Sequence, residues 1–232
     1  MPVDGNAKEG SFVQFAVFKL DSKWHVLGLD ERRKGVAAFL DSLDGRHVHT
    51  HIYLLSGLKA SSDILLWKIA KNMEDLQDSH IAMKRTVFGS HLSDVAIYTG
   101  VTKPSTYTRT ESELEFLASA EKRKKYISFY PFTKTVEWYL LAYEKRRKIM
   151  SDHIAIGKKF PEVSQVLLYS FGADDQEFVV AYEMDDMKQY IDCVMALRES
   201  ESRLYTKTDT PVFTGVRKRP EELLSLFGGI NE

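Results

Sequence analysis

Several features are scarce in this sequence, and each scarcity excludes a class of protein. The 232 residues contain one cysteine, Cys193, so no intrachain disulfide and no multi-cysteine metal site can form. Lysine and arginine number 32 against 33 acidic residues, which gives a net charge of −1. Proteins that bind nucleic acid usually carry a basic excess, so we expect no nucleic-acid partner. The apolar runs are far shorter than the ~20 residues that a membrane helix needs.

The first residues, MPVDGNAKEGS, also lack the basic segment and the apolar core of a signal peptide. A single cysteine suits a reducing compartment, so we expect a cytoplasmic protein with no membrane contact. Apolar residues make up 44% and charged residues 28%, the composition of a soluble globular protein with a sizeable core.

The residue pattern of the first half predicts strands alternating with helices. A stretch rich in β-branched and aromatic residues is typical of a strand, and an acidic start is typical of a helix. We expect strands at 11–20, 47–55 and 95–101 and helices at 30–43 and 61–77, the latter N-capped by Ser62. A connector rich in turn-forming residues follows at 102–112.

The second half shows a similar order of elements. A strand is expected at 124–134 and one long amphipathic helix at 136–160. A hairpin around Gly172 then joins strands at 164–173 and 177–184. A helix at 186–205 and a strand at 211–218 complete the half, and the chain from Arg219 is expected to be peripheral.

Each half therefore approximates the β-α-β-β-α-β order of a ferredoxin-like unit. Hairpins imply antiparallel pairing, which favours an α+β fold with helices on one face of each sheet. We divide the chain at 1–112 and 113–232, with no residue-level repeat between the halves.

A histidine stands in the apolar stripe of the long helix. Ile149, His153, Ile156 and Phe160 fall at i, i+4, i+7 and i+11, which places them on one side of a helix. Spacing alone favours an ordinary core histidine over a ligand.

One face of the strand before this helix is aromatic and ends in a lysine. Because side chains alternate along a strand, Tyr126, Ser128, Tyr130, Phe132 and Lys134 share that face. Lys134 either serves a buried site or reaches water by its flexible stem.

Three segments resemble the chlorite dismutase-like family, nearest its coprohaem decarboxylase branch of haem-dependent peroxidases. They are YPFTKTVEWYLL, SDHIAIGKKFPEVSQVLLYSFGADDQEFVVAYEMDD and ALRESESRLYTKTDTPVFTG. The likeness covers residues 124–218 and extends more weakly to 53–67. It is specific as an ordered combination rather than in any single motif.

The resemblance implies a fold, a cofactor and a reaction. The fold would be tandem ferredoxin-like units forming a dimeric α+β barrel, assembled as a homopentamer. Haem b or iron coproporphyrin III would lie in the C-terminal half. The protein would be a haem-dependent oxidoreductase that uses hydrogen peroxide to decarboxylate iron coproporphyrin III to haem b. The alternatives are a haem peroxidase or chlorite dismutase, and a non-catalytic haem-binding ring protein.

The resemblance also assigns roles to residues. His153 matches the iron ligand, Glu201 the partner of that ligand, and Trp138 a tryptophan beside it. Tyr130 matches the tyrosine that is oxidised to a radical and takes hydrogen from a propionate, and Lys134 the lysine that holds this propionate.

Two further positions bear on the substrate. Gln165 stands where chlorite dismutases have a distal arginine, and a neutral amide at this place favours coprohaem over chlorite as the substrate. If the alignment is shifted by one residue, Val166 takes this place instead. Lys158 replaces a frequent arginine five residues after the ligand histidine, where it would contact the porphyrin.

A second cluster of histidines lies in the first half. His47, His49 and His51 alternate along one strand and could share a metal ion, or they could form a polar or subunit-facing surface.

Overall fold

The computed structural model describes residues 10–45, 47–104, 107 and 123–229, which form two compact units. One unit comprises residues 10–99 and 215–229, and the other comprises 100–104, 107 and 123–214. The expected boundary between residues 112 and 113 lies outside the described residues. Within these ranges, no helix has the length and apolarity to cross a membrane.

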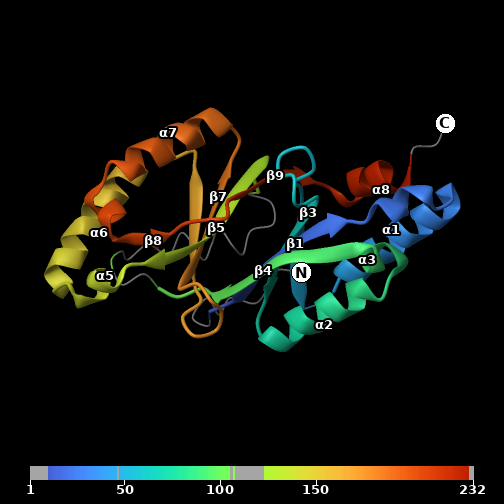
Figure 1. The fold of residues 1–232 in the computed structure, drawn as a ribbon, viewed down its shortest axis with the longest axis horizontal. Helices are drawn as coiled ribbons and strands as arrows, with labels where there is room; N and C mark the ends of the chain where they lie inside the picture. The colour runs from blue at the N-terminus through green and yellow to red at the C-terminus, as the bar shows by residue number, and fades with distance from the viewer. Residues whose placement is uncertain (1–9, 46, 105–106, 108–122, 230–232) are drawn as a thin grey trace. The chain divides into compact units, whose positions relative to one another are not determined.

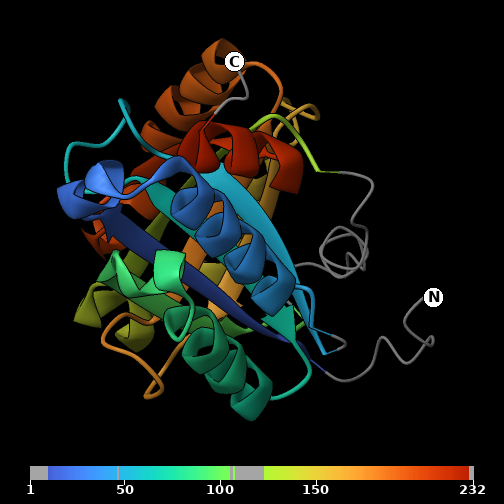
Figure 2. The same cartoon turned by 90° about the vertical axis from the view of Figure 1, so that its right-hand side faces the viewer.

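The unit of residues 10–99 is an antiparallel sheet with helices on it (Figures 1 and 2). Its strands follow the order β4-β1-β3-β2-β9. The strands are β1 (Phe12–Leu20), β2 (Val48–Leu54), β3 (Ile64–Ala70), β4 (Leu92–Val101) and β9 (Phe213–Lys218). The helices are η1 (Ser22–Val26), α1 (Leu29–Leu43), α2 (Met73–Lys84), α3 (Val87–Ser90) and α8 (Pro220–Gly228).

The helix expected at 61–77 was wrong, because residues 64–70 form the central strand β3. All seven of its residues are buried, and it pairs antiparallel with both β1 and β2. A short apolar run such as ILLWKIA fits a buried strand and a buried helix equally well. Helix α2 begins only at Met73, and its N-cap is Asn72 rather than Ser62.

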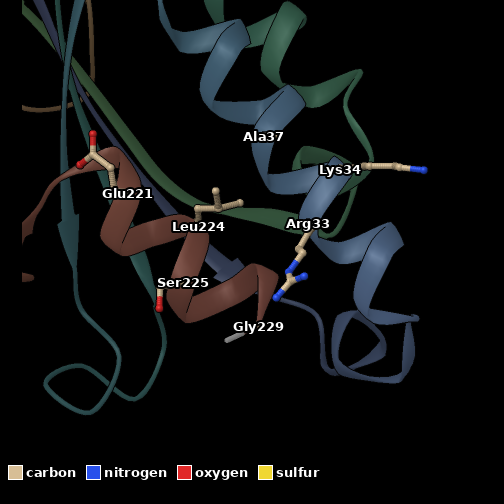
Figure 3. A pocket seen from close by; sticks show the side chains of 7 residues that line it. All are labelled: Arg33, Lys34, Ala37, Glu221, Leu224, Ser225 and Gly229. Carbon is tan, nitrogen blue, oxygen red and sulfur yellow. The ribbon is translucent and has the colours of Figure 1, made fainter. Parts of the chain in front are cut away.

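The C-terminal helix α8 is part of the core, which corrects the expectation of a peripheral tail. Leu223 is fully buried in the cluster that contains Trp24, Phe39 and Phe88. Trp24 Nε1 donates a hydrogen bond of 3.0 Å to the Phe227 carbonyl. Helices α1 and α8 also line a surface groove of about 520 Å³, with Leu224 between the charged side chains of Arg33, Lys34 and Glu221 (Figure 3).

The unit of residues 100–214 contains a further set of antiparallel strands, in which β7 pairs with both β6 and β5. Its strands are β5 (Tyr126–Lys134), β6 (Ser164–Tyr169), β7 (Phe178–Met184) and β8 (Thr206–Thr208). The helices are α5 (Val136–Leu140), α6 (Tyr143–Gly157), α7 (Met187–Arg198) and the 3-10 helix η3 (Glu201–Tyr205). Helices α6 and α7 lie side by side (Figure 1). The hairpin around Gly172, which has φ of +71°, is confirmed.

The long helix expected at 136–160 is two helices. Leu141 and Ala142 have extended ψ values of 144° and 142° and separate α5 from α6. Neither proline nor glycine marks this break in the sequence. The break allows α5 to bury Trp138, which contacts Tyr205, while α6 buries Ile149. The helix expected at 186–205 likewise ends at Arg198, and η3 follows it.

The two units repeat each other with a constant offset of 114 residues over most of their length. Strands β1 and β5 begin at Phe12 and Tyr126, and β3 and β7 begin at Ile64 and Phe178. Helices α1 and α6 begin at Leu29 and Tyr143, and α2 and α7 begin at Met73 and Met187. Each pair has equal length, with 9, 7, 15 and 12 residues respectively. The expected α+β fold of two ferredoxin-like units is therefore confirmed.

Candidate functional site

The expected site residues lie in the unit of residues 100–214, and Lys134 is the most unusual of them. It ends β5 with only 8% of its surface exposed. Its ammonium lies 4.4 Å from the centre of the Trp138 ring and donates to the Ser202 carbonyl at 3.4 Å. Among the described residues, no carboxylate lies within ion-pair distance of this ammonium. Burial lowers the pKa of Lys134 to about 8, with a partial offset from Glu177.

A buried ammonium with one long hydrogen bond is suited to an added anion. The charge of the Glu177 carboxylate acts on Lys134. This carboxylate, however, accepts hydrogen bonds from two other donors, the Lys134 backbone N–H at 2.7 Å and the Tyr139 hydroxyl. Trp138, 3% exposed, contributes the cation–π contact that holds the lysine stem in place. Lys134 can therefore bind a carboxylate that enters from outside the chain.

His153 lies on α6 and is kept neutral by its surroundings. Desolvation and the nearby charge of Lys134 lower the pKa of His153 to about 4. Its Nδ1 contacts two hydroxyls, Ser202 Oγ at 2.8 Å and Ser200 Oγ at 3.0 Å. Within the described residues, no protein group is bonded to Nε2. A neutral imidazole with one unengaged nitrogen is the form that binds a metal.

Tyr130 belongs to a cluster of tyrosines on one face of the sheet. Its ring centre is 6.3 Å from that of Tyr182. Tyr182 in turn lies 5.3 Å from Tyr190. Burial raises the pKa of Tyr130, so its phenol stays protonated at neutral pH.

Gln165 shares the sheet face of the tyrosines. It pairs with Tyr182 across β6 and β7, and paired residues project to the same side. The side chain of Gln165 is exposed, whereas the neighbouring Val166 is 1% exposed on the opposite face. The geometry thus brings Gln165, rather than Val166, to the face that carries Tyr130.

Two of the sequence-predicted residues lie apart from this group. Lys158 is the C-cap of α6, and its side chain is exposed. The Glu201 side chain is half exposed and faces Lys145 at 4.0 Å. Ser200 and Ser202, the residues on either side of Glu201, contact His153 Nδ1. In this structure Glu201 is therefore not the hydrogen-bond partner of the histidine that the resemblance led us to expect.

The sequence did not reveal several residues around the site. Ser200 and Ser202 flank the glutamate that the family pattern highlights, and nothing in RESES distinguishes them before η3 is known. Arg198 and Arg203 both pair with Asp209, at 2.8 and 2.6 Å, and their charges act on Tyr130. The sequence singled out neither arginine, because both fall inside the helix that was expected at 186–205.

The three histidines of the first half do not form a metal site. Across the residues that the structure describes, no group of three or more histidine, cysteine or acidic side chains is placed to hold a metal ion. His51 instead packs edge-on against Trp67, with ring centres 6.0 Å apart.

Comparison with known proteins gives consistent matches. The profile of the family described as "Chlorite dismutase" matches residues 30–218. A "Coproheme decarboxylase" of Mycolicibacterium smegmatis is 30% identical over 190 residues, 82% of each chain. A second, from Staphylococcus carnosus, is 29% identical and covers 83% of this chain and 80% of its own. Chlorite dismutase from Candidatus Nitrospira defluvii in complex with imidazole superimposes with a TM-score of 0.86 at 26% identity, covering 94% of this chain and 95% of that one.

Proposed function

Because the chain belongs to the chlorite dismutase family, we propose that it catalyses the peroxide-dependent oxidative decarboxylation of iron coproporphyrin III to haem b. As a member of this family it is a haem-dependent enzyme with an iron porphyrin as its cofactor. The two relatives named as coprohaem decarboxylases support coprohaem as the substrate. The single observation that carries the proposal is the buried Lys134 ammonium, which has no carboxylate partner in the described part of the chain and shares the residue Ser202 with a neutral histidine.

The donor set fits an iron porphyrin with propionate side chains. His153 offers Nε2 from a ring held neutral, which is the form of a proximal haem ligand. Lys134 offers a desolvated cation for a propionate, and Trp138 forms an aromatic surface beside it. Both Lys134 and His153 contact Ser202, so the cation and the ligand are held by the same residue.

The iron porphyrin, when bound, supplies the oxidising chemistry with peroxide. Lys134 would hold the carboxylate of the reacting propionate. The Tyr130 phenol, which is protonated in the buried cluster, would first lose a hydrogen atom to the oxidant that peroxide supplies, and the resulting radical would take a hydrogen atom from the propionate. Loss of carbon dioxide and of a second electron to the same oxidant would leave a vinyl group, so that one peroxide serves one propionate. Tyr182 packs against the Tyr130 ring, with ring centres 6.3 Å apart. Gln165 would present a neutral amide on the same face, and Arg198 and Arg203 are further cations near Tyr130. Lys158, which is exposed at the end of α6, would contact the porphyrin at the edge of the site.

A substitution of Tyr130 tests this assignment. Tyr130→Phe keeps the ring but removes the oxidisable phenol, so we expect coprohaem binding to persist and decarboxylation to fall at least about 100-fold. The purified protein is loaded with iron coproporphyrin III, treated with peroxide, and the porphyrin mass is followed through the mono-decarboxylated species to haem b.

The matched control is Tyr126→Phe, four residues earlier on the same strand face and packed in the same cluster. This variant should convert coprohaem at the parental rate. Carbon dioxide release at the parental rate by Tyr130→Phe would refute the proposed role of that phenol.

Chlorite is the second candidate substrate, because the chain superimposes on a chlorite dismutase. The neutral amide of Gln165 argues against it, since an arginine is expected at this place for chlorite. Gln165→Arg should therefore introduce chlorite-dependent oxygen release that the parent protein lacks, measured with an oxygen electrode. Oxygen release by the parent at a comparable rate would favour chlorite over coprohaem.

We further propose that the protein is cytoplasmic and assembles as a homopentamer, as the family resemblance implies. Exposed apolar side chains in the unit of residues 100–214, with Val136 68%, Leu140 80% and Leu204 75% exposed, are of the kind that subunit contacts cover.

A further inference from the structure

The hydrogen bonds around His153 Nδ1 determine where their protons lie. Ser200 Oγ is 2.7 Å from the Leu197 carbonyl oxygen. A carbonyl can only accept, so the single hydroxyl proton of Ser200 is directed to Leu197. Ser200 Oγ has no second proton, and it must therefore accept from both of its other partners, His153 Nδ1 at 3.0 Å and Ser202 Oγ at 2.9 Å.

The proton positions of the remaining atoms follow. Ser202 directs its hydroxyl proton to Ser200 Oγ. His153 Nδ1 must then carry a proton, which it donates to the two serine oxygens at 3.0 and 2.8 Å. A neutral imidazole with a proton on Nδ1 has a bare lone pair on Nε2. The backbone carbonyl at the end of α7 thus fixes a proton on the histidine of α6 through two serines.

We infer that Ser200 and Ser202 are positioning residues, which hold His153 as the Nδ1–H tautomer and keep the Nε2 lone pair ready for the porphyrin iron. This inference rests on the proposed porphyrin site. The position of a ligating histidine and its tautomer are usually set by such a partner on the second ring nitrogen.

The identity of the partner has a consequence for the ligand. A carboxylate on Nδ1 would draw the proton away and give the imidazole anionic character, as in carboxylate–histidine–metal arrangements. Here the adjacent carboxylate of Glu201 faces Lys145, and the partners are neutral hydroxyls. His153 is therefore a weaker electron donor than a carboxylate-bound histidine would be.

Ser202 also connects His153, the proposed iron ligand, to Lys134, the proposed propionate-binding residue. Its hydroxyl contacts His153 Nδ1, and its carbonyl accepts the Lys134 ammonium at 3.4 Å. Residue 202 is 5% exposed, so this connection is shielded from solvent. The backbone of Ser202 contacts Lys134, whereas its side chain contacts His153. Substitution of the side chain should therefore alter the hydrogen bonding of His153 more than that of Lys134.

The direct test is ¹⁵N NMR of the histidine rings in the full chain without porphyrin. In the parent protein, His153 should show a protonated Nδ1 and an unprotonated Nε2. Ser200→Ala frees the Ser202 hydroxyl to donate to Nδ1, so both tautomers should appear at comparable populations. Ser200→Thr keeps the hydroxyl and should restore a single tautomer. Ser151→Ala, exposed on α6 two residues from His153, is the control that should change nothing.

Porphyrin binding provides the second readout. Haem b affinity of the Ser200→Ala/Ser202→Ala variant should fall about 10-fold, the lower end of the effect of losing partners of a metal ligand. Ser202→Asp should raise the iron–histidine stretching frequency of the ferrous complex by resonance Raman. A parent protein with its proton on Nε2, or an unchanged tautomer in Ser200→Ala, would overturn the inference. If the tautomer is as expected but coprohaem is not converted, only the proposed reaction fails.

Discussion

At the scale of single residues, burial of two lysines has different meanings. Lys134 lies among contacts that an incoming carboxylate would complete. Lys68, fully buried on β3, has the Met83 sulfur at 3.7 Å as its hydrogen-bond partner and feels the charge of Asp94. Burial lowers the pKa of both lysines to about 8. For Lys68, the charge of Asp94 offsets only part of this cost, so the buried charge destabilises the fold.

Replacing Lys68 by methionine should therefore stabilise the protein. At pH 7, Lys68→Met removes a desolvated charge while keeping a flexible side chain of similar size, and the free energy of unfolding should rise by about 1–3 kcal/mol. Chemical denaturation measures it. Lys71→Met, at an exposed site three residues later, should stay within about 0.5 kcal/mol of the parent.

The pH dependence gives an independent check on Lys68. Between about pH 8 and the ordinary lysine pKa of 10.5, the unfolded lysine holds a proton and the folded one does not. The free energy of unfolding therefore rises with pH across this window. In Lys68→Met this rise should shrink, and the part that remains comes from Lys134. Lower stability of Lys68→Met at pH 7 would show that the ammonium has a favourable partner.

At the scale of elements, the sequence located most strands but confused one of them with a helix. Alternating and β-branched runs identified β1, β2, β4 and β5 within a few residues. Strand β3 was missed because its pattern is continuous rather than alternating, as in any strand covered on both faces. The pairing with β1 and β2, which local sequence does not encode, decides its conformation.

The start of helix α2 provides a paired test of this correction. The Asn72 side chain accepts a hydrogen bond of 2.8 Å from the Asp75 backbone, so Asn72→Ala should lower the free energy of unfolding by about 1 kcal/mol. The buried Ser62 hydroxyl has no partner among the described residues, so Ser62→Ala should be neutral or slightly stabilising. Thermal or urea unfolding compares them. The reverse ranking would restore the helix that begins near Ser62.

At the scale of the whole chain, the same arrangement of helices and strands occurs twice, but matching positions carry residues with different roles. Trp24 and Trp138 occupy matching places 114 residues apart, and both are buried. Phe39, the residue that matches His153 at the same offset, is fully buried in the apolar core of its unit. The same helix position thus closes a core in one unit and offers an imidazole in the other.

The proposed assembly is tested by mass. Light scattering coupled to size exclusion should give five times the 26.6 kDa of one chain. Charged substitution of the exposed apolar residues, as in Leu140→Glu, should shift this mass downward if they lie in a subunit contact, because a buried charge without a partner is costly. A mass of 26.6 kDa for the parent would contradict the homopentamer.

The sequence by itself determined the fold class, the order of most elements and the motif that assigns the chain to its family. These depend on local periodicity and on residue types at fixed spacing, both of which are properties of the linear chain. Tertiary structure alone decided that ILLWKIA is a strand, that the helix after Lys134 breaks at Leu141, and that serines rather than Glu201 meet His153. Those outcomes depend on contacts between segments far apart in sequence, where packing and hydrogen-bond geometry outweigh local preference.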